Sequence, residues 1–224
     1  MEYLTLNNGI QMPLVGFGTF MLGGEICTNA VAAAIQNGYR MIDTAEAYDN
    51  EKEVGEEIRQ SGIDRKKLFL VTKVNFKSYE NAEQTILQSL ANLQTDYIDL
   101  LLLHWPFANY YAAWRVLEKL YAEGKTYAPL GQGSRGEMFQ EPTVLALAEK
   151  YGKTPAQILL RFLMQKDIIV IPRSTKPEHI RENFGLFDFA LTADEMIQLS
   201  ALDKKEPLIG RPETPELVEF SLTW

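Results

Sequence analysis

Hydrophobic positions follow two spacings that alternate along the chain. Short apolar runs are separated by longer stretches in which apolar residues recur at helical spacing. The apolar runs are residues 39–42, 68–72, 97–103 and 168–171, and the helical stretches are residues 28–37, 51–60, 80–93 and 111–123. Near-continuous runs of leucine and β-branched residues are typical of strands that are buried on both faces. The alternation therefore predicts repeated βα units around a parallel sheet.

Turn residues mark where these elements end. Gly38, Gly62 and Gly124 each follow a helical stretch, at the position where a left-handed residue commonly closes a helix. Near the start of the chain, Asn8 and Gly9 separate two short segments, and Asn-Gly favours a type I′ turn. We therefore expect a β-hairpin over residues 5–12, in front of the first βα unit.

Composition limits the class of protein. The 224 residues are 46% hydrophobic and 23% charged, and no Pro/Ser-rich linker divides them, which predicts a single domain over residues 1–224. The formal net charge of −8 argues against a nucleic-acid or anionic-membrane partner. With no apolar stretch of signal-peptide or membrane-spanning length, we expect a cytoplasmic protein.

Cysteine and histidine are scarce. Cys27 is the only cysteine, so an intrachain disulfide is excluded, and His104 and His179 are the only histidines. This supply of ligands makes a metal site unexpected.

Three ionisable residues follow successive apolar runs. Asp43, Lys73 and His104 are separated by 30 and 31 residues, the length of one βα unit. In a β/α barrel the carboxyl ends of the strands converge on one face, and that face carries the chemistry. Taken singly, such a residue at a strand end is more often a turn residue or a surface charge. Their joint spacing predicts that they meet in one pocket.

Residues 38–55 read GYRMIDTAEAYDNEKEVG, and this segment resembles the first signature of the aldo-keto reductases. The resemblance extends to VGFGTF near the start, LVTKV at Lys73, LLLHWP at His104, YAPLG at Tyr127 and IPRSTKPEHIRENF from Ile171. It is similar to the bacterial diketogluconate-reductase-like members. The resemblance implies a TIM-type (β/α) barrel. It also implies an oxidoreductase that transfers hydride from NAD(P)H to the carbonyl of a small aldehyde, ketone or keto-sugar acid.

The resemblance assigns the acid–base role to Tyr48. A carbonyl that accepts hydride develops alkoxide charge, so a donor must protonate it. A phenol is a reluctant donor at neutral pH, and Lys73 would stabilise the phenolate that remains. Asp43 would pair with Lys73, and His104 would orient the substrate carbonyl. A packed tyrosine with a locally satisfied hydroxyl is the plain structural alternative for Tyr48.

Substrate and nicotinamide contacts also follow from the resemblance. Phe20 and Trp105 correspond to aromatic residues that flank the substrate with Tyr48 and His104. The residues matched to the nicotinamide, ribose and pyrophosphate end of the cofactor are Gly18, Thr19, Asp43, Tyr127, Leu130, Gly131 and Gln132.

The segment from Ile171 resembles the family's site for the adenosine 2′-phosphate. Arg173, Ser174 and Thr175 would end the last strand and open a helix, whose N-terminus favours a phosphate. Glu182 and Asn183 match residues that contact the adenine. His179 stands where the family normally has arginine, and a neutral imidazole reads a phosphate less strongly. NADP(H) is therefore the expected cofactor, with a modest preference over NAD(H).

The resemblance has a gap. Lys125, at the end of the fourth helical stretch, is followed at once by residues 126–129, which resemble the seventh strand of the family. The units that resemble strands 5 and 6 and their helices are therefore missing between 125 and 126, which leaves about six of eight βα units. An omission from the printed sequence, a shortened gene product and a deliberately contracted barrel all remain open as origins.

The gap qualifies the prediction of function and assembly. A barrel with all its units would be a monomer, whereas a shortened one exposes strand edges and favours self-association. In a shortened barrel, residues 126–129 would lie beside the strand that ends at His104. Two alternatives to an active reductase follow, namely a cofactor-binding regulatory or scaffold protein and an inactive truncated form.

Overall fold

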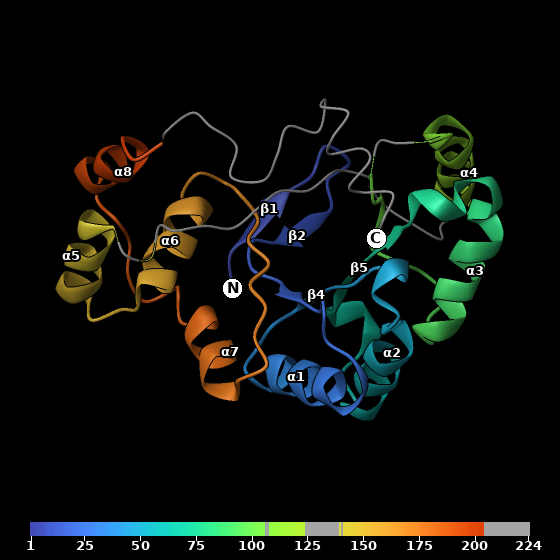
Figure 1. The fold of residues 1–224 in the computed structure, drawn as a ribbon, viewed down its shortest axis with the longest axis horizontal. Helices are drawn as coiled ribbons and strands as arrows, with labels where there is room; N and C mark the ends of the chain where they lie inside the picture. The colour runs from blue at the N-terminus through green and yellow to red at the C-terminus, as the bar shows by residue number, and fades with distance from the viewer. Residues whose placement is uncertain (106–107, 124–138, 140, 204–224) are drawn as a thin grey trace.

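The centre of the molecule is a parallel sheet of four strands. The structure is a computed structural model that describes residues 1–105, 108–123, 139 and 141–203. The strands lie in chain order, as β3 (Phe17–Gly18), β4 (Met41–Asp43), β5 (Phe69–Val74) and β6 (Leu100–Leu103). Each is followed by a helix, and these are α1 (Gly24–Gln36), α2 (Glu51–Gln60), α3 (Ala82–Asn92) and α4 (Tyr110–Ala122). Figure 1 shows the helices around the outer side of the sheet. The first four of the predicted βα units are confirmed.

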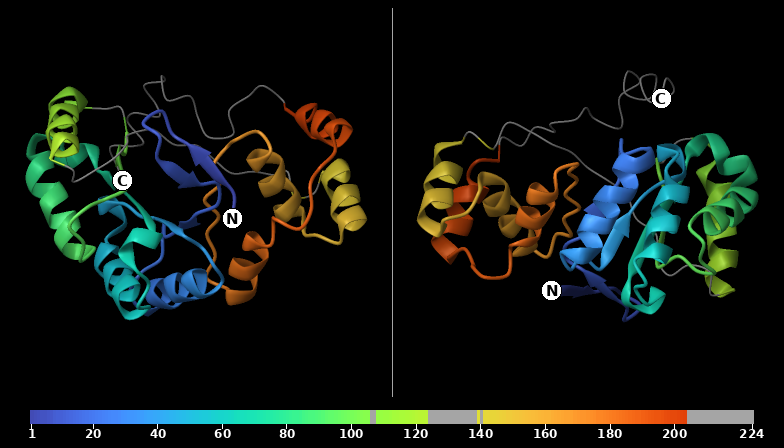
Figure 2. Two further views of the ribbon diagram at one scale, coloured as in Figure 1. Left: turned by 180° about the vertical axis from the view of Figure 1, so that it is seen from behind. Right: turned by 90° about the horizontal axis from the view of Figure 1, so that it is seen from below.

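The second half of the described chain is helical. It contains α5 (Pro142–Tyr151), α6 (Pro155–Met164), α7 (Pro177–Phe184) and α8 (Ala193–Ser200). Figure 2 shows α5, α6 and α8 at the opposite end of the molecule from α3 and α4. Of these four helices, α7 packs against α1, and α6 contributes Met164 to the core cluster of the sheet region.

A segment before α7 extends the sheet on its β3 edge. Val170 forms a parallel bridge with Val15, and the N–H of Gly16 donates to the Val170 carbonyl at 2.9 Å. The N–H of Gly18 donates to the Pro172 carbonyl at 3.1 Å. The strand predicted over residues 168–171 is therefore an isolated bridge in this structure, although it lies where the last barrel strand is expected.

This arrangement agrees with the TIM-type (β/α) barrel that the sequence predicts, because parallel strands in chain order alternate with helices. The four strands and the bridged segment account for every predicted strand position except residues 126–129. Those residues, like Gly124, lie outside the described part of the chain. Their predicted place beside β6 therefore stays a prediction.

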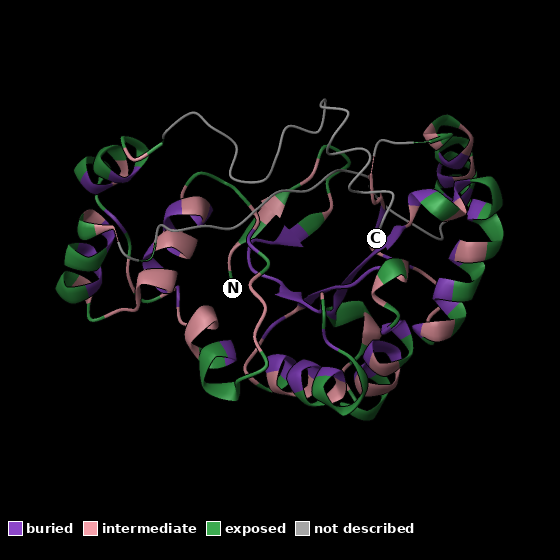
Figure 3. Cartoon of the chain, viewed as in Figure 1, coloured by how far each residue is buried: buried purple, intermediate pink, exposed green. Residues whose placement is uncertain are grey.

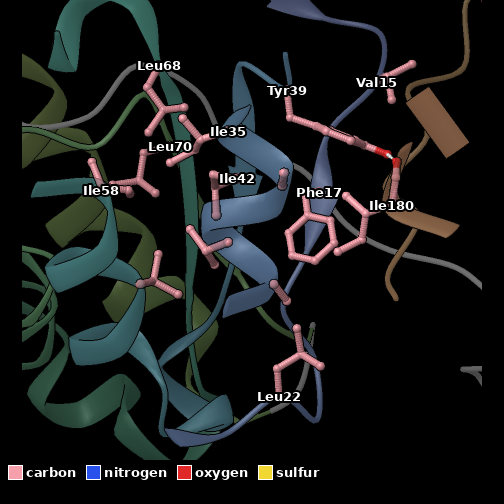
Figure 4. Packing of buried hydrophobic residues seen from close by; sticks show 14 of the residues in the cluster. Val15, Phe17, Leu22, Ile35, Tyr39, Ile42, Ile58, Leu68, Leu70 and Ile180 are labelled. Carbon is pink, nitrogen blue, oxygen red and sulfur yellow. Dashed lines mark hydrogen bonds between the residues drawn. The ribbon is translucent and has the colours of Figure 1, made fainter. Parts of the chain in front are cut away.

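The strands alternate between two buried faces. Every residue of β4 and β5 is buried, as expected for strands covered on both sides (Figure 3). Ile42 and Leu70 face the outer helices in the cluster drawn in Figure 4. Met41 and Val71 belong to a separate inner cluster together with Met12 of the hairpin. Since side chains alternate along a strand, Asp43 is on the inner face with Met41, and Lys73 is on it with Val71.

The N-terminal hairpin is present, but its predicted turn type is wrong. β1 (Tyr3–Thr5) pairs antiparallel with β2 (Gln11–Pro13). Gly9 has a φ of +85°, whereas Asn8 is not among the residues of positive φ, and a type I′ turn requires both. The Gly9 N–H instead donates to the Leu6 carbonyl at 2.9 Å, and the Leu6 N–H donates to the Ile10 carbonyl. The loop is therefore longer than a two-residue type I′ turn, and of Asn8 and Gly9 only Gly9 has a left-handed backbone.

Two predicted helix ends are confirmed. Gly38 has a φ of +100° and follows α1, and Gly62 has a φ of +66° and follows α2. The helix starts were less accurate: α1 begins at Gly24 rather than at residue 28. A 3-10 segment, η3 (Phe76–Asn81), precedes α3 where the helix was expected to begin at residue 80.

Candidate active site

A buried ammonium is at the centre of the site. The Lys73 Nζ donates to Asp43 Oδ1 at 2.7 Å, to the Thr44 carbonyl at 2.8 Å and to the Tyr48 hydroxyl at 3.4 Å. Lys73 and Asp43 are only 2% and 4% exposed. In the sheet Asp43 pairs with Val71, two residues before Lys73 on the same face. The parallel register therefore brings the two charges together at the carboxyl end of the strands.

Tyr48 lies beside this ion pair. It ends a 3-10 turn, η1 (Glu46–Tyr48), that follows β4. Its half-buried ring lies 5.0 Å from the Phe20 ring and 5.6 Å from the His104 ring, measured between centroids. The hydroxyl thus has an ammonium within hydrogen-bond distance, and the ring has aromatic neighbours from two other strand ends.

His104 follows β6 directly, and its N–H donates to the Val74 carbonyl at 3.0 Å. Burial, reinforced by the positive charge of Lys73, lowers the pKa of His104 to about 4. The imidazole is therefore neutral at pH 7 and has one N–H to donate. The ring of Trp105 stacks beside it at a centroid distance of 6.4 Å.

The two carboxylate oxygens of Asp43 differ in their hydrogen bonds. Burial raises the pKa of Asp43, against the opposing effect of the Lys73 ammonium. Its Oδ2 atom is buried and has no hydrogen-bond partner in the described part of the chain. The backbone N–H and the hydroxyl of Thr19 both donate to the Asp43 carbonyl, at 3.0 and 3.1 Å. The end of β3 therefore fixes the Asp43 backbone and leaves a carboxylate oxygen for a ligand.

Gly18 packs closely against the bridged segment. A Cβ at this position would lie 3.2 Å from Ile171 Cγ2 and 3.3 Å from the Ile171 carbonyl oxygen. A side chain here would need the segment that leads to Arg173 to move by a few tenths of an ångström. In this structure, the small size of Gly18 thus serves the approach of that segment.

Arg173 reaches from the bridged segment across the loop after β3. Its Nη2 donates to the Met21 carbonyl at 3.4 Å, while its buried Nε has no partner among the described residues. The Ser174 hydroxyl accepts from the Lys176 N–H at 3.1 Å, and α7 begins at Pro177. The helix therefore starts two residues after Thr175, later than the sequence predicts, because the prolyl ring fits the first helical position.

The predicted adenine residues lie on α7. His179 is exposed, and Glu182 and Asn183 are half-buried. The Tyr39 hydroxyl donates to the Ile180 carbonyl at 3.1 Å, and this bond holds α7 against the sheet region (Figure 4). The four remaining predicted cofactor residues lie outside the described residues, and they are Tyr127, Leu130, Gly131 and Gln132.

Sequence reasoning missed two buried polar residues next to the site, Thr44 and Asn50. The Asn50 amide Oδ1 accepts from the Thr44 hydroxyl at 2.8 Å, and its Nδ2 donates to the carbonyls of Thr19 and Leu22. Both residues are fully buried. The only signal in the sequence was their place inside the 38–55 motif.

The described residues hold neither a cluster of metal ligands nor a membrane-spanning helix. In residues 1–105, 108–123, 139 and 141–203, no group of three or more His, Cys, Asp or Glu side chains could hold a metal ion. None of the helices in the same ranges has the length and apolar character needed to cross a membrane.

Comparison with known proteins gives a consistent family. The model of the "Aldo/keto reductase family" matches residues 14–128 and 140–204. A "Glyoxal reductase" of Bacillus subtilis is 35% identical over 95% of this chain and 96% of its own length. A "Morphine 6-dehydrogenase" of Pseudomonas putida is 33% identical over 89% of this chain and 90% of its own length.

Solved structures agree with the sequence comparison. The crystal structure of MGS-M4, an aldo-keto reductase from a Medee basin deep-sea metagenome library, superposes with a TM-score of 0.89 at 30% identity. It covers 94% of this chain and 98% of the other. The fold and the sequence therefore point to the same family.

The alignments are longer than the chain itself. The match to the glyoxal reductase spans 266 positions, whereas the chain has 224 residues, so at least 42 positions of the alignment carry no residue of this chain. Since the family model nevertheless matches on both sides of residues 129–139, and the relatives reduce carbonyl groups, the chain belongs to the aldo-keto reductase family and is an NAD(P)H-dependent oxidoreductase.

Proposed function

We propose that Tyr48 is the proton donor in the reduction of a small aldehyde, ketone or keto-sugar acid. The observation that carries this proposal is the Lys73 ammonium, which contacts both Asp43 Oδ1 and the Tyr48 hydroxyl. Bound NAD(P)H supplies a hydride to the carbonyl carbon. The Tyr48 hydroxyl gives its proton to the carbonyl oxygen, which yields an alcohol and a phenolate that solvent reprotonates.

Lys73 and Asp43 support the acid–base role of Tyr48. The ammonium stabilises the negative charge left on the phenolic oxygen, and its burial strengthens that interaction. Asp43 holds the ammonium in place at 2.7 Å and balances its charge. The pair is thus preorganised before substrate binds, which is the usual source of electrostatic catalysis.

His104 orients the substrate in this proposal. With a pKa of about 4 its imidazole is neutral, so it donates an N–H to the carbonyl oxygen without competing for the proton of Tyr48. Phe20 and Trp105 flank the tyrosine and the histidine, and they supply the apolar walls of the site. A small, compact carbonyl compound, such as the one named for the glyoxal reductase relative, suits these neighbours.

NADPH is proposed as the preferred cofactor. Two orphaned atoms fit a bound dinucleotide: the Asp43 Oδ2 can accept from a hydroxyl, and the Arg173 Nε can donate to an anion. Arg173, Ser174 and Thr175 would hold the 2′-phosphate, and His179, Glu182 and Asn183 the adenine. Gly18 and Thr19 would lie near the ribose. Tyr127 would contact the nicotinamide, and Leu130, Gly131 and Gln132 the pyrophosphate. Because His179 is not arginine, the preference over NADH is modest.

The domain is proposed to be one barrel over residues 1–224 that lacks two βα units between 125 and 126. The unmatched alignment positions support this proposal. Open strand edges in such a barrel favour association with a second copy.

The test is product formation by the full chain, with an intact mass of 25.5 kDa checked first. The protein is mixed with NADPH and a panel that includes glyoxal, a simple ketone and a keto acid. We expect alcohol in an amount equal to the NADPH consumed. NADPH binding, seen as a change in its fluorescence, without any alcohol would overturn the proposal and favour the regulatory alternative.

A further inference from the structure

A buried amide links the loops on both sides of Asp43. Asn50 Nδ2 donates its two hydrogens to the Thr19 carbonyl at 2.9 Å and to the Leu22 carbonyl at 2.7 Å. Both acceptors belong to the loop after β3, so the amide is fixed from that side. Since the amide plane is then determined, the direction in which Asn50 Oδ1 points is determined as well.

The third bond of this amide leads to the catalytic ammonium. Asn50 Oδ1 accepts from the Thr44 hydroxyl at 2.8 Å, and the Thr44 N–H donates to the Val71 carbonyl at 2.9 Å. The Thr44 carbonyl in turn accepts from Lys73 Nζ at 2.8 Å. The Thr44 peptide is therefore held by its side chain and by its N–H, and its carbonyl faces the ammonium.

The contact with Tyr48 depends on the other two contacts of the ammonium. An ammonium has three hydrogens, and Lys73 directs them at Asp43, at the Thr44 carbonyl and at Tyr48. The bond to Tyr48, at 3.4 Å, is the longest of the three. A shift of the Thr44 carbonyl would turn the ammonium, and the longest bond would be lost first.

We infer that Asn50 is a positioning residue for carbonyl reduction, which acts through Thr44 to keep the Lys73 ammonium directed at the Tyr48 hydroxyl. This inference rests on the proposed roles of Tyr48 and Lys73. Lys73 donates to the phenol and to Asp43, the His104 ring lies 5.6 Å from the Tyr48 ring, and Glu46 and Asp49 belong to the same turn as Tyr48. The hydrogen bonds of Asn50 go instead to Thr44, Thr19 and Leu22.

The decisive variants remove either the whole amide or only its bond to Thr44. Asn50→Ala removes the amide, and Thr44→Val removes only the hydroxyl that reaches it. Thr44→Ser keeps that hydroxyl. Asn37→Ala is the matched control, because Asn37 also donates a side-chain N–H to a backbone carbonyl, that of Ala33, at the far end of α1. Each variant is measured for kcat and KM with NADPH and glyoxal. The kcat is normalised to the fraction of the protein that binds NADPH.

We expect Asn50→Ala and Thr44→Val to lower kcat by about tenfold to a hundredfold, the scale of a small misplacement at a reacting centre. The KM for glyoxal should change by less than about threefold, on the same reasoning. Thr44→Ser keeps the hydroxyl, so its kcat should be close to that of the wild type. If Asn50→Ala does not fold, Thr44→Val alone decides. Wild-type kcat in a folded Asn50→Ala or Thr44→Val protein, or an equal loss of kcat in Asn37→Ala, would overturn the inference.

The Lys73→Met background separates this inference from the proposed function. If Asn50 acts through Lys73, then adding Asn50→Ala to Lys73→Met should lower kcat by less than about twofold, because coupled residues are not additive. A full additional loss would show that Asn50 acts by another route and would overturn the inference. Wild-type kcat in Lys73→Met alone would instead remove the proposed role of Lys73.

Discussion

The two halves of the molecule are organised in different ways. In the sheet half, α1 and α2 pack against the outer face of β3, β4 and β5, around Phe17, Ile42 and Leu70. In the helical half, α5, α6 and α8 pack mainly on one another, around Val144, Ile158, Phe162, Leu191 and Leu199. Figure 1 shows these two bodies at opposite ends, with α7 between them.

Side-chain N-caps occur in both halves. α6 and α8 both start with a capping box, from Thr154 with Gln157 and from Thr192 with Glu195, and α4 is capped by the Asn109 side chain. The other helices of both halves have no side-chain bond at their N-caps, and they are α1, α2, α3, α5 and α7. The halves therefore differ in what their helices pack against and not in how the helices begin.

This difference indicates where the chemistry lies. Asp43, Lys73 and His104 come from strand ends of the sheet half, where the parallel arrangement of the strands brings them into one cluster. The helical half contributes α7 and the segment around Arg173, which contact the sheet half at one edge. The comparison predicts that acid–base chemistry and cofactor affinity can be changed separately.

Substitutions in the hydrophobic cores of the two halves are expected to have the largest effect on stability. Ile158 and Ile42 are both fully buried, and replacing either by alanine should lower the free energy of unfolding by about 2–5 kcal/mol. Only Ile42→Ala should also lower kcat of the folded protein, because Ile42 adjoins Asp43 on β4. Urea unfolding and turnover of both variants check this. Loss of turnover in fully folded Ile158→Ala would show that the helical half shapes the acid–base site.

A smaller effect is expected on cofactor affinity. Arg173→Ala should weaken NADPH binding by about 1.5–3 kcal/mol, the value of a charge-assisted hydrogen bond, and leave NADH nearly unaffected. Fluorescence titration with both cofactors measures it. Arg181→Ala is the control, since Arg181 is an exposed arginine of α7. An equal loss for NADH and NADPH would show that Arg173 does not read the 2′-phosphate.

A further effect concerns the acid stability of the sheet half. The pKa of His104 is about 4 in the folded protein, below the ordinary value of 6.5. As pH falls from 6.5 towards 4, the unfolded chain binds a proton that the folded chain refuses, so stability is lost in that window. His104→Gln should therefore lose less stability than the wild type over the same window, by urea unfolding. His179→Gln, on exposed α7, is the control, and parallel curves for wild type and His104→Gln would contradict the assignment.

Much of this arrangement could be predicted from the sequence, for a physical reason. Strands buried on both faces leave long apolar runs, and the one-unit spacing of Asp43, Lys73 and His104 follows from the barrel geometry. The bridged segment at Val170 was also found in this way, although it forms a bridge and not a full strand.

Local hydrogen-bond geometry was harder to predict. The hairpin loop depends on the φ of Asn8, which Asn-Gly alone does not determine. The start of α7 moved to Pro177 because proline prefers the first helical turn. The link from Asn50 to Thr44 was missed because a buried amide has no spacing pattern, and its partners Thr19 and Leu22 come from a loop far away in sequence.

The central claim is that Lys73 acts on Tyr48, and a double-mutant cycle tests it most directly. kcat for NADPH-dependent glyoxal reduction is measured for Tyr48→Phe, Lys73→Met and the double variant. We predict a loss of at least ~100-fold for each single variant, the scale of lost acid–base catalysis, with NADPH affinity nearly unchanged. The kcat of the double variant should be no lower than that of the less active single variant, because the effects of residues that act as a unit are not additive. Losses that multiply, or wild-type turnover in Tyr48→Phe, would contradict the claim.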